Sequence, residues 1–372
     1  MLFLGLVALV TAFVVTVVIA KPIIGWLRRM RFGQKILEIG PKWHMNKQNI
    51  PTMGGFLFII GITAAVLLCL LLYYLSDLTG VLTGVIGLIS DWRNISAVGV
   101  IGGADGPTSI LVSTRVSSIL SGVMVLGLAL AYGAVGMVDD LAKIKKKQNA
   151  GLTPIQKLIL QIVVAAVFIT VLRIAGGVDT AVWVPFVNVS FRVPWVIYII
   201  LSAFIIVGAD NAVNLTDGLD GLAAGVTVPV ALFFVAVGFR QNNAGVVIFA
   251  AALAGALVAF LIFNFNPAKV FMGDTGSLFL GGAVSGLAFA CDMPLILIPV
   301  GIIYIWETLS VIIQVAYFKL THGKRVFKMA PFHHHLEMCG WSERKIVITF
   351  ALITAVLCAI AWCFGVTPHA AA

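Results

Sequence analysis

The side chains best suited to chemistry are five aspartates in three short segments. The segments are GMVDDLAKIKKK with Asp139 and Asp140, NLTDGLDG with Asp217 and Asp220, and MGDTGS with Asp274. The 372 residues include only 15 Asp and Glu, so each carboxylate can be weighed singly. Asp217 and Asp220 share a face if their segment is helical. The neighbours Asp139 and Asp140 point in different directions, and we expect separate roles for them.

Five carboxylates at one boundary would repel one another, and each costs on the order of 3 kcal/mol inside a membrane segment. A cation would relieve this repulsion. Oxygen ligands without cysteine, next to a phosphate substrate, favour Mg²⁺ with retained waters over zinc. Bound Mg²⁺ would neutralise a diphosphate and direct an attack on it. The alternative for any single aspartate is a solvated cap at a helix end.

Glycines flank two of the acidic segments. Gly273 and Gly276 bracket Asp274, and Gly218 and Gly221 flank Asp220. Their backbone amides can approach an anion closely. Glycine is also a common packing residue of membrane helices, so this signal has two readings.

Histidine and lysine residues add two further candidate sites. The run PFHHHLE (331–337) carries three of the six histidines. It is either a surface metal-binding tract or a set of imidazoles that binds a diphosphate. The lysines after Asp140 either attract phosphate or serve as a signal for topology and lipid headgroups, and they are Lys143, Lys145, Lys146 and Lys147.

The elements that must position these side chains are membrane helices. The chain is 61% hydrophobic and 10% charged, whereas soluble domains carry about 25% charged residues. Several apolar runs approach the roughly 20 residues that cross the ~30 Å hydrocarbon core, among them 2–20, 56–75, 158–174 and 244–263. We predict an all-α polytopic integral membrane protein with one membrane-embedded domain over 1–372. The five scattered cysteines, with no C-x-x-C pair, indicate neither a disulfide framework nor a zinc site.

Ten transmembrane helices are predicted, starting near residues 2, 53, 119, 155, 195, 218, 244, 277, 295 and 345. With an external N-terminus, the loops 21–52, 139–157, 264–276 and 319–345 all face the cytoplasm. These loops hold 19 of the 24 Lys and Arg, as the positive-inside rule requires. The net charge of +9 therefore reflects topology and indicates no nucleic-acid partner. Both termini are then periplasmic, and the aspartates lie at the cytoplasmic boundary.

Two connections have a distinct composition. Residues 176–194 include WVPFVNVSFRVP, which alternates β-branched and aromatic residues around Asn188 and predicts a short periplasmic β-hairpin. Residues 76–118 are rich in Gly, Ser and Thr. Because the helices on either side run out and back, this segment must cross the membrane an even number of times or dip in without crossing.

Taken together, the motifs resemble the phospho-N-acetylmuramoyl-pentapeptide transferases of the polyprenyl-phosphate N-acetylhexosamine-1-phosphate transferase superfamily. The matching segments, in order, are PTMGG (51–55), GMVDDLAKIKKK (136–147), GLTPIQK (151–157), NAVNLTDGLDGLA (211–223), NPAKVFMGDTGSL (266–278), ETLSVIIQV (307–315) and PFHHHLE (331–337). Each is weak alone, and the ordered set is specific. The histidine loop resembles the muramoyl-pentapeptide branch more than the N-acetylglucosamine-1-phosphate branch.

The resemblance implies a bacterial inner-membrane enzyme, commonly a homodimer in the lipid bilayer, with its active site in a cytoplasmic groove. The implied substrates are UDP-MurNAc-pentapeptide and undecaprenyl phosphate, and the implied products are lipid I and UMP. A phosphate oxygen of the lipid would attack the sugar-linked phosphorus. Asp139 would deprotonate or orient that phosphate. A covalent aspartyl-phosphate step is the open alternative.

Further roles follow from the same resemblance. Asp274 is the implied principal Mg²⁺ ligand, and Asp217 is the second. The implied catalytic residues are Asp139, Asp140, Asp217, Asp274 and His333. The implied substrate-binding residues are Lys47, Asn211, Asn214, Asp220, Phe271, Gly273, Gln314, His334 and His335. Among these, Phe271 would stack on the uracil base.

One departure from the family concerns chain length. Gly55 and Asp139 are separated by 83 residues, about forty more than the family leads us to expect. An extra segment at about 76–118 therefore stands between the second and third family helices. Within it, VIGGADGPTSI (100–110) resembles a motif of the β subunit of sodium-pumping decarboxylases, where such a break lines an ion path. On that reading Asp105 is an ion site.

Three classes of function compete at this point. The transferase reading predicts aspartates at one membrane face. An ion or solute transporter would carry its charges near the bilayer midplane, often with internal repeats, and we find no repeat. A structural scaffold would need neither glycine-flanked aspartates nor the triple histidine. Within the transferase class, UDP-GlcNAc is the alternative donor.

Overall fold

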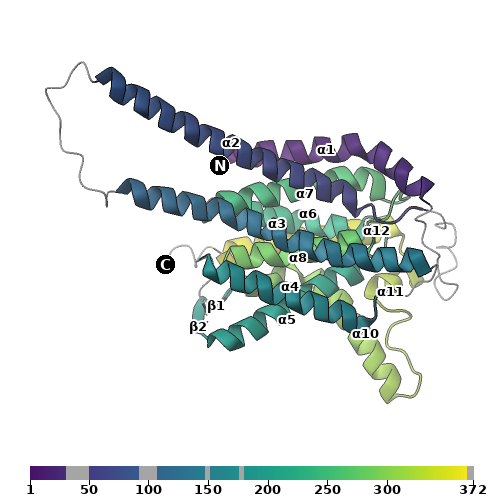
Figure 1. Cartoon of the computed structure of the whole chain (residues 1–372). Coiled ribbons are helices and arrows are strands. Elements are labelled where there is room, and N and C mark those ends of the chain that lie inside the picture. Colours follow the sequence, from purple (N-terminus) through teal and green to yellow (C-terminus); the bar gives the residue numbers. More distant parts are fainter. Residues whose placement is uncertain (31–49, 92–106, 147–150, 176–179, 367–372) are drawn as a thin grey trace.

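The computed structural model describes residues 1–30, 50–91, 107–146, 151–175 and 180–366, with side chains omitted for 77–91, 107–118 and 146. Long helices run along a common direction (Figure 1). The elements are α1 (Leu2–Arg29), α2 (Gly55–Asp91), α3 (Pro107–Lys146), α4 (Pro154–Ile174), β1 (Ala181–Val184), β2 (Val189–Arg192), α5 (Trp195–Thr216), α6 (Leu222–Arg240), α7 (Ala244–Asn264), α8 (Gly273–Ala290), η3 (Pro294–Ile296), α9 (Leu297–Val300), α10 (Ile302–Leu320), α11 (Phe332–Met338), α12 (Glu343–Ile360) and η4 (Ala361–Val366).

Nine helices of the described chain are long and apolar enough to cross a membrane: α1, α2, α3, α4, α5, α6, α7, α10 and α12, the last continuing into η4. The multi-pass helical prediction is therefore confirmed. Of the ten predicted helix starts, the one near residue 277 corresponds to α8, which is not among these nine helices. Its sequence GDTGSLFLGGAVSGLAFA is diluted by glycine and serine, and 15 of its 18 residues are buried. Protein surrounds α8 where lipid surrounds a typical span, so it needs less apolar character.

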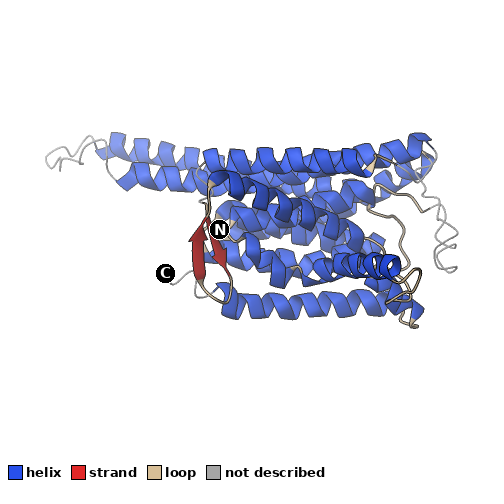
Figure 2. Ribbon diagram, turned by 90° about the horizontal axis from the view of Figure 1, so that it is seen from below, coloured by secondary structure: helices blue, strands red, loops and turns tan. Residues whose placement is uncertain are grey.

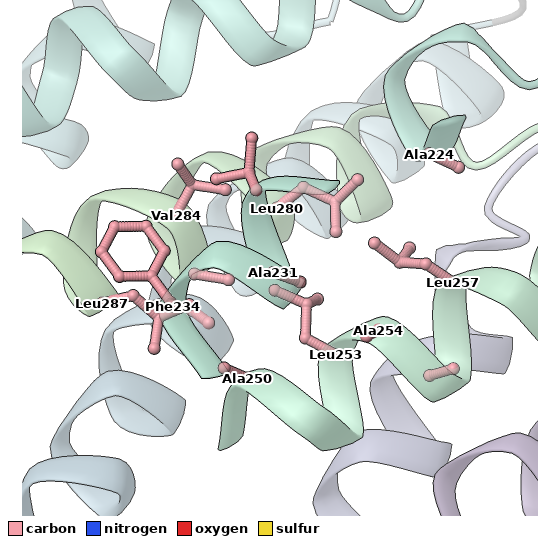
Figure 3. Packing of buried hydrophobic residues seen from close by; sticks show 14 of the residues in the cluster. Ala224, Ala231, Phe234, Ala250, Leu253, Ala254, Leu257, Leu280, Val284 and Leu287 are labelled. Carbon is pink, nitrogen blue, oxygen red and sulfur yellow. The ribbon is translucent and has the colours of Figure 1, made fainter. Parts of the chain in front are cut away.

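The middle of the bundle is formed by α7 and α8. In α7, 17 of 21 residues are buried, and the helix packs against α1, α2, α3 and α6. In the buried cluster, Ala231 of α6 lies beside Leu253 of α7, and Phe234 of α6 lies beside Leu287 of α8 (Figure 3). Small residues allow helices to approach closely, which is how membrane helices gain packing energy where apolar contact with lipid gives none.

The connection between α4 and α5 forms the predicted hairpin. Strands β1 and β2 pair in antiparallel register from Ala181 with Arg192 to Val184 with Val189. Phe186 and Asn188 have positive φ in the turn, and the indole of Trp183 donates to the Asn188 side chain at 3.1 Å. The two-stranded hairpin is confirmed, and its periplasmic location stays a prediction.

The two ends of the bundle differ. The hairpin lies at one end, and α11 with the histidine run lies at the other (Figures 1 and 2). Residue Gly365 near the end of η4 packs beside Pro185 and Phe186 of the hairpin turn, so the described C-terminal segment lies at the hairpin end.

The described parts of the predicted extra segment, 76–91 and 107–118, continue α2 and α3. Helices α2 and α3 both extend past the rest of the bundle at the hairpin end (Figure 1). Their lengths of 37 and 40 residues correspond to roughly 55–60 Å at about 1.5 Å per residue, longer than a single crossing needs. Most of the VIGGADGPTSI motif, including Asp105, falls outside the described residues.

Helices α3 and α8 touch backbone to backbone beside the acidic segments. A Cβ atom added to Gly136 of α3 would overlap the carbonyl group of Asp274 on α8. The glycine therefore sets the distance between α3 and α8, and with it the distance between the aspartates that the two helices carry.

We predict that Gly136→Ala lowers the free energy of unfolding by about 1–3 kcal/mol, because the added methyl group meets backbone that cannot rotate away. The matched control is Gly127→Ala on the same helix, where an added Cβ meets nothing within 4 Å. Thermal unfolding of both variants in detergent measures the difference. Equal stability of the two variants would show that the helix contact at Gly136 is not limiting.

Candidate active site

Asp140 ties α3 to the start of α8. Its carboxylate accepts hydrogen bonds from the backbone N–H groups of Asp274 at 3.2 Å and Thr275 at 2.8 Å. The Thr275 hydroxyl donates to the same carboxylate at 2.7 Å. Asp140 thus acts as an N-cap supplied by another helix, satisfying amides that the α8 N-terminus leaves open.

Asp139 faces the connection between α3 and α4. Its Oδ1 accepts from the backbone N–H of Leu152 at 2.6 Å, and a Cβ on Gly151 would overlap this carboxylate. Its other oxygen, Oδ2, lies 2.7 Å from Nζ of Lys143. Asp139 and Asp140 thus point toward different hydrogen-bond partners, as expected for neighbours on a helix, and their separate roles stay a prediction.

Two ammonium groups lie among the carboxylates. Nζ of Lys143 is 2.9 Å from Oδ2 of Asp274 as well as 2.7 Å from Asp139 and 3.9 Å from Asp140. Nζ of Lys157, in the first turn of α4, is 3.0 Å from the same Asp274 oxygen. Asp274 is therefore the point where α3, α4 and α8 converge.

Helix α5 approaches the same carboxylate from another side. The amide of Asn214 donates to Oδ1 of Asp274 at 3.1 Å and contacts the Ser277 hydroxyl at 2.7 Å. Asn211, one turn earlier, instead exchanges hydrogen bonds with Gln161 of α4. Of the two asparagines predicted to bind substrate, Asn214 contacts Asp274. Asn211 contacts Gln161 instead.

Asp217 follows the last turn of α5 and is half-buried. Its pKa is raised well above the ordinary value, because burial disfavours the carboxylate and because Asp274, Asp140 and Asp220 repel its charge.

Asp220 has partners in the loop before α8. Its Oδ2 accepts from the side chain of Asn266 at 3.2 Å and from the backbone N–H of Ala268 at 3.0 Å. The backbone N–H of the next residue, Gly221, donates to Asn264 at 3.0 Å. These bonds join the NLTDGLDG loop to the 264–268 turn, and the substrate role of Asp220 stays a prediction.

The three histidines of α11 have three different environments. Nδ1 of His333 lies 2.9 Å from Oε2 of Glu307 on α10, and both side chains are buried. Nδ1 of His334 lies 2.7 Å from Glu337 in the same short helix. Nδ1 of His335 accepts from the backbone N–H of Lys328 at 3.1 Å. The ring of His333 lies against Gly218 of the NLTDGLDG loop.

Three further predicted residues, Phe271, Gly273 and Gln314, contact neighbouring loops or Asp140. The backbone of Phe271 pairs with the PTMGG segment, accepting from Gly54 N–H at 2.7 Å and donating to Pro51 at 2.9 Å. Gly273 has a φ of 69° and would bring a Cβ against Asp140. The side chain of Gln314 bonds backbone groups of Val326 and Phe327. Lys47 lies outside the described residues.

The oxygen-rich donor set suits Mg²⁺. Among the described residues, no three His, Cys, Asp or Glu side chains are arranged to hold a metal ion on their own. Mg²⁺ in phosphate-transferring sites is usually bound by one or two carboxylates together with substrate phosphates and water. Asp274 and Asp217 stay the predicted carboxylates of such a site.

Comparison with known proteins first defines the class. Residues 122–292 match the family described as Glycosyl transferase family 4. This range includes α4 to α8 and most of the described side chains of α3, and therefore all five aspartates.

Full-length relatives define the branch. The chain is 40% identical over 345 residues to a protein of Geobacillus thermodenitrificans, with 92% of each chain covered, and 43% identical over 357 residues to one of Clostridium perfringens, with 95% and 96% covered. A protein of Halalkalibacterium halodurans is 42% identical over 346 residues, with 93% and 92% covered. All three are named phospho-N-acetylmuramoyl-pentapeptide-transferase. The chain belongs to the phospho-N-acetylmuramoyl-pentapeptide-transferase family.

We predict that Lys143→Met lowers stability by about 1–3 kcal/mol in the presence of a chelator, between the values for exposed and buried ion pairs. The loss arises because Asp139 and Asp274 then repel one another without a cation between them. Lys145→Met, an exposed residue on the same helix, is the control. Thermal unfolding with and without Mg²⁺ measures both, and Mg²⁺ should restore Lys143→Met selectively. A loss as small as that of the control would contradict the bridging role.

Proposed function

We propose that this protein transfers phospho-MurNAc-pentapeptide from UDP-MurNAc-pentapeptide to undecaprenyl phosphate, giving lipid I and UMP. The observation that carries the proposal is the convergence of Lys143, Lys157 and Asn214 on Asp274 at one end of the bundle, with Asp139 bound to the same Lys143. It stands in a chain about 40% identical, over nearly its whole length, to relatives that carry this transferase name.

In the proposed reaction, a phosphate oxygen of the lipid attacks the sugar-linked phosphorus, a new P–O bond forms, and the bond to the UMP oxygen breaks. Asp139, held by Leu152 and Lys143, orients the lipid phosphate or accepts its proton. Lys143 and Lys157 are the described cations nearest Asp274 and would bind phosphate oxygens. Mg²⁺ bound by Asp274 and Asp217 would supply charge neutralisation of the diphosphate.

The orientation of the site is part of the proposal. We place the α11 end in the cytoplasm of a bacterial inner membrane and the hairpin and both termini in the periplasm. The basic loops predicted to face the cytoplasm, with 19 of 24 Lys and Arg, support this orientation. We further propose a homodimer, by analogy with the family.

The test is UMP release by purified protein with undecaprenyl phosphate, comparing UDP-MurNAc-pentapeptide with UDP-GlcNAc. We expect release from the muramoyl donor, loss on chelation, and at least a 10³-fold lower rate, as an order of magnitude, in Asp274→Asn. The control is Asp292→Asn, beyond the opposite end of α8, where φ is 54° and asparagine tolerates that conformation.

The outcomes separate the candidate functions. Release from UDP-GlcNAc alone would move the chain to the N-acetylglucosamine-1-phosphate branch. No release from either donor by folded protein would contradict the transferase proposal. Full activity of Asp274→Asn would contradict the assignment of the reaction to this cluster.

A further inference from the structure

Glu307 on α10 is a fully buried carboxylate, and its bonds lead to one residue. Its Oε2 lies 2.9 Å from Nδ1 of His333, and its Oε1 accepts from the His333 backbone N–H at 3.2 Å. The second bond also caps α11, because the residue before that helix is Pro331, which offers no side-chain cap. Glu307 therefore fixes both the start of α11 and the ring of His333.

The contact decides which ring nitrogen of His333 is available. A carboxylate accepts hydrogen bonds, so Nδ1 carries the hydrogen whether the imidazole is neutral or protonated. The atom left to exchange a proton or a hydrogen bond with another group is Nε2. Nε2 is buried and has no hydrogen-bond partner within the described part of the chain.

Nε2 of His333 points at the NLTDGLDG loop. A Cβ added to Gly218 would overlap Nε2 and Cε1 of His333, so the ring lies directly against the backbone between Asp217 and Leu219. A buried ring nitrogen without a partner is costly unless a ligand completes it. With Nδ1–H bound to Glu307, the protonated ring presents Nε2–H, which can donate to a phosphate oxygen, whereas the neutral ring presents a lone pair there.

The neighbouring histidines differ in this respect. His334 is held by Glu337 of its own helix and is partly exposed, and Nδ1 of His335 accepts from Lys328. Neither arrangement links the ring to a separate membrane helix. The pairing of His333 with Glu307 is thus specific to one member of the run.

We propose that Glu307 is a positioning residue that acts through His333: its carboxylate holds Nδ1–H of the protonated ring, so that Nε2–H donates to a phosphate oxygen of the donor beside the Gly218 backbone. The proposal rests on the proposed transferase function. Carboxylate partners of histidine commonly fix tautomer and ring orientation at functional sites.

Glu307→Gln separates the two roles of Glu307. The amide oxygen of glutamine can still accept the His333 backbone N–H and cap α11. Its NH₂ group, however, is a donor, and Nδ1 must then become an acceptor. We expect the fold to persist, the ring to become the neutral Nε2–H tautomer and lose its positive charge, and kcat to fall by about 10²-fold with KM changed less than about threefold.

A double-mutant cycle tests whether Glu307 acts through His333. If it does, adding Glu307→Gln to His333→Gln should change kcat by less than about threefold, because residues that act as one unit are not additive. The control is Tyr304→Phe, one turn earlier on α10, which removes a buried 2.8 Å hydrogen bond to Thr227 without touching His333. Multiplicative losses in the double variant, or an equal kcat loss in Tyr304→Phe, would overturn the proposal.

A spectroscopic measurement keeps this test independent of turnover. In ¹⁵N-histidine-labelled full-length protein, the ring signals of His333 are identified by their absence in His333→Gln. We expect Nδ1 to be protonated in the wild type and unprotonated in Glu307→Gln. Wild-type protein that releases no UMP would contradict the proposed function, and the ring signals would still decide the tautomer. An unprotonated wild-type Nδ1 would overturn the inference.

Discussion

The structure depends on placing several carboxylates together at one end of an apolar helix bundle. Donors from other elements stabilise each carboxylate: backbone amides of α8 for Asp140, the Leu152 N–H before α4 for Asp139, and Lys157 of α4 with Asn214 of α5 for Asp274. Because a buried charge without partners is strongly unfavourable, these donors constrain how the helices pack. The same charges make the site suitable for a phosphate substrate and a cation.

Helix α8 shows how this constraint governs the fold. Its N-terminus carries Asp274 and lies in the cluster, and its small residues let neighbouring helices surround it. A Cβ on Gly281 would overlap Asp210 of α5, as one on Gly136 of α3 would overlap Asp274. The helix is therefore fixed by contacts that exclude even a methyl group. Helix α8 is less apolar than the nine candidate membrane spans, and its N-terminus nevertheless lies at the centre of the site.

Much of this arrangement was predictable from the sequence. Apolar runs of the right length located the membrane helices, alternation around Asn188 located the hairpin, and the ordered motifs indicated the family. The sequence alone did not assign Lys157 or Glu307 a role, although both stand in family motifs. Their partners, Asp274 and His333, are 117 and 26 residues away, so only the packing of α4 and α10 brings each pair together. The motifs GLTPIQK and ETLSVIIQV were the available signals. The roles of Asp220 and Gln314 as substrate ligands stay predictions, since loop groups occupy them here.

Divalent-cation binding by the acidic cluster is most directly measured with Mn²⁺ as a paramagnetic substitute for Mg²⁺, using electron paramagnetic resonance on purified protein. Wild-type protein should bind Mn²⁺ more tightly when UDP-MurNAc-pentapeptide is present, because the donor diphosphate completes the ligand set that two carboxylates begin. Asp274→Asn should lose this binding, and Asp292→Asn should keep it. Equal Mn²⁺ binding by Asp274→Asn and wild type in the presence of the donor would contradict the assignment of the cation to this cluster.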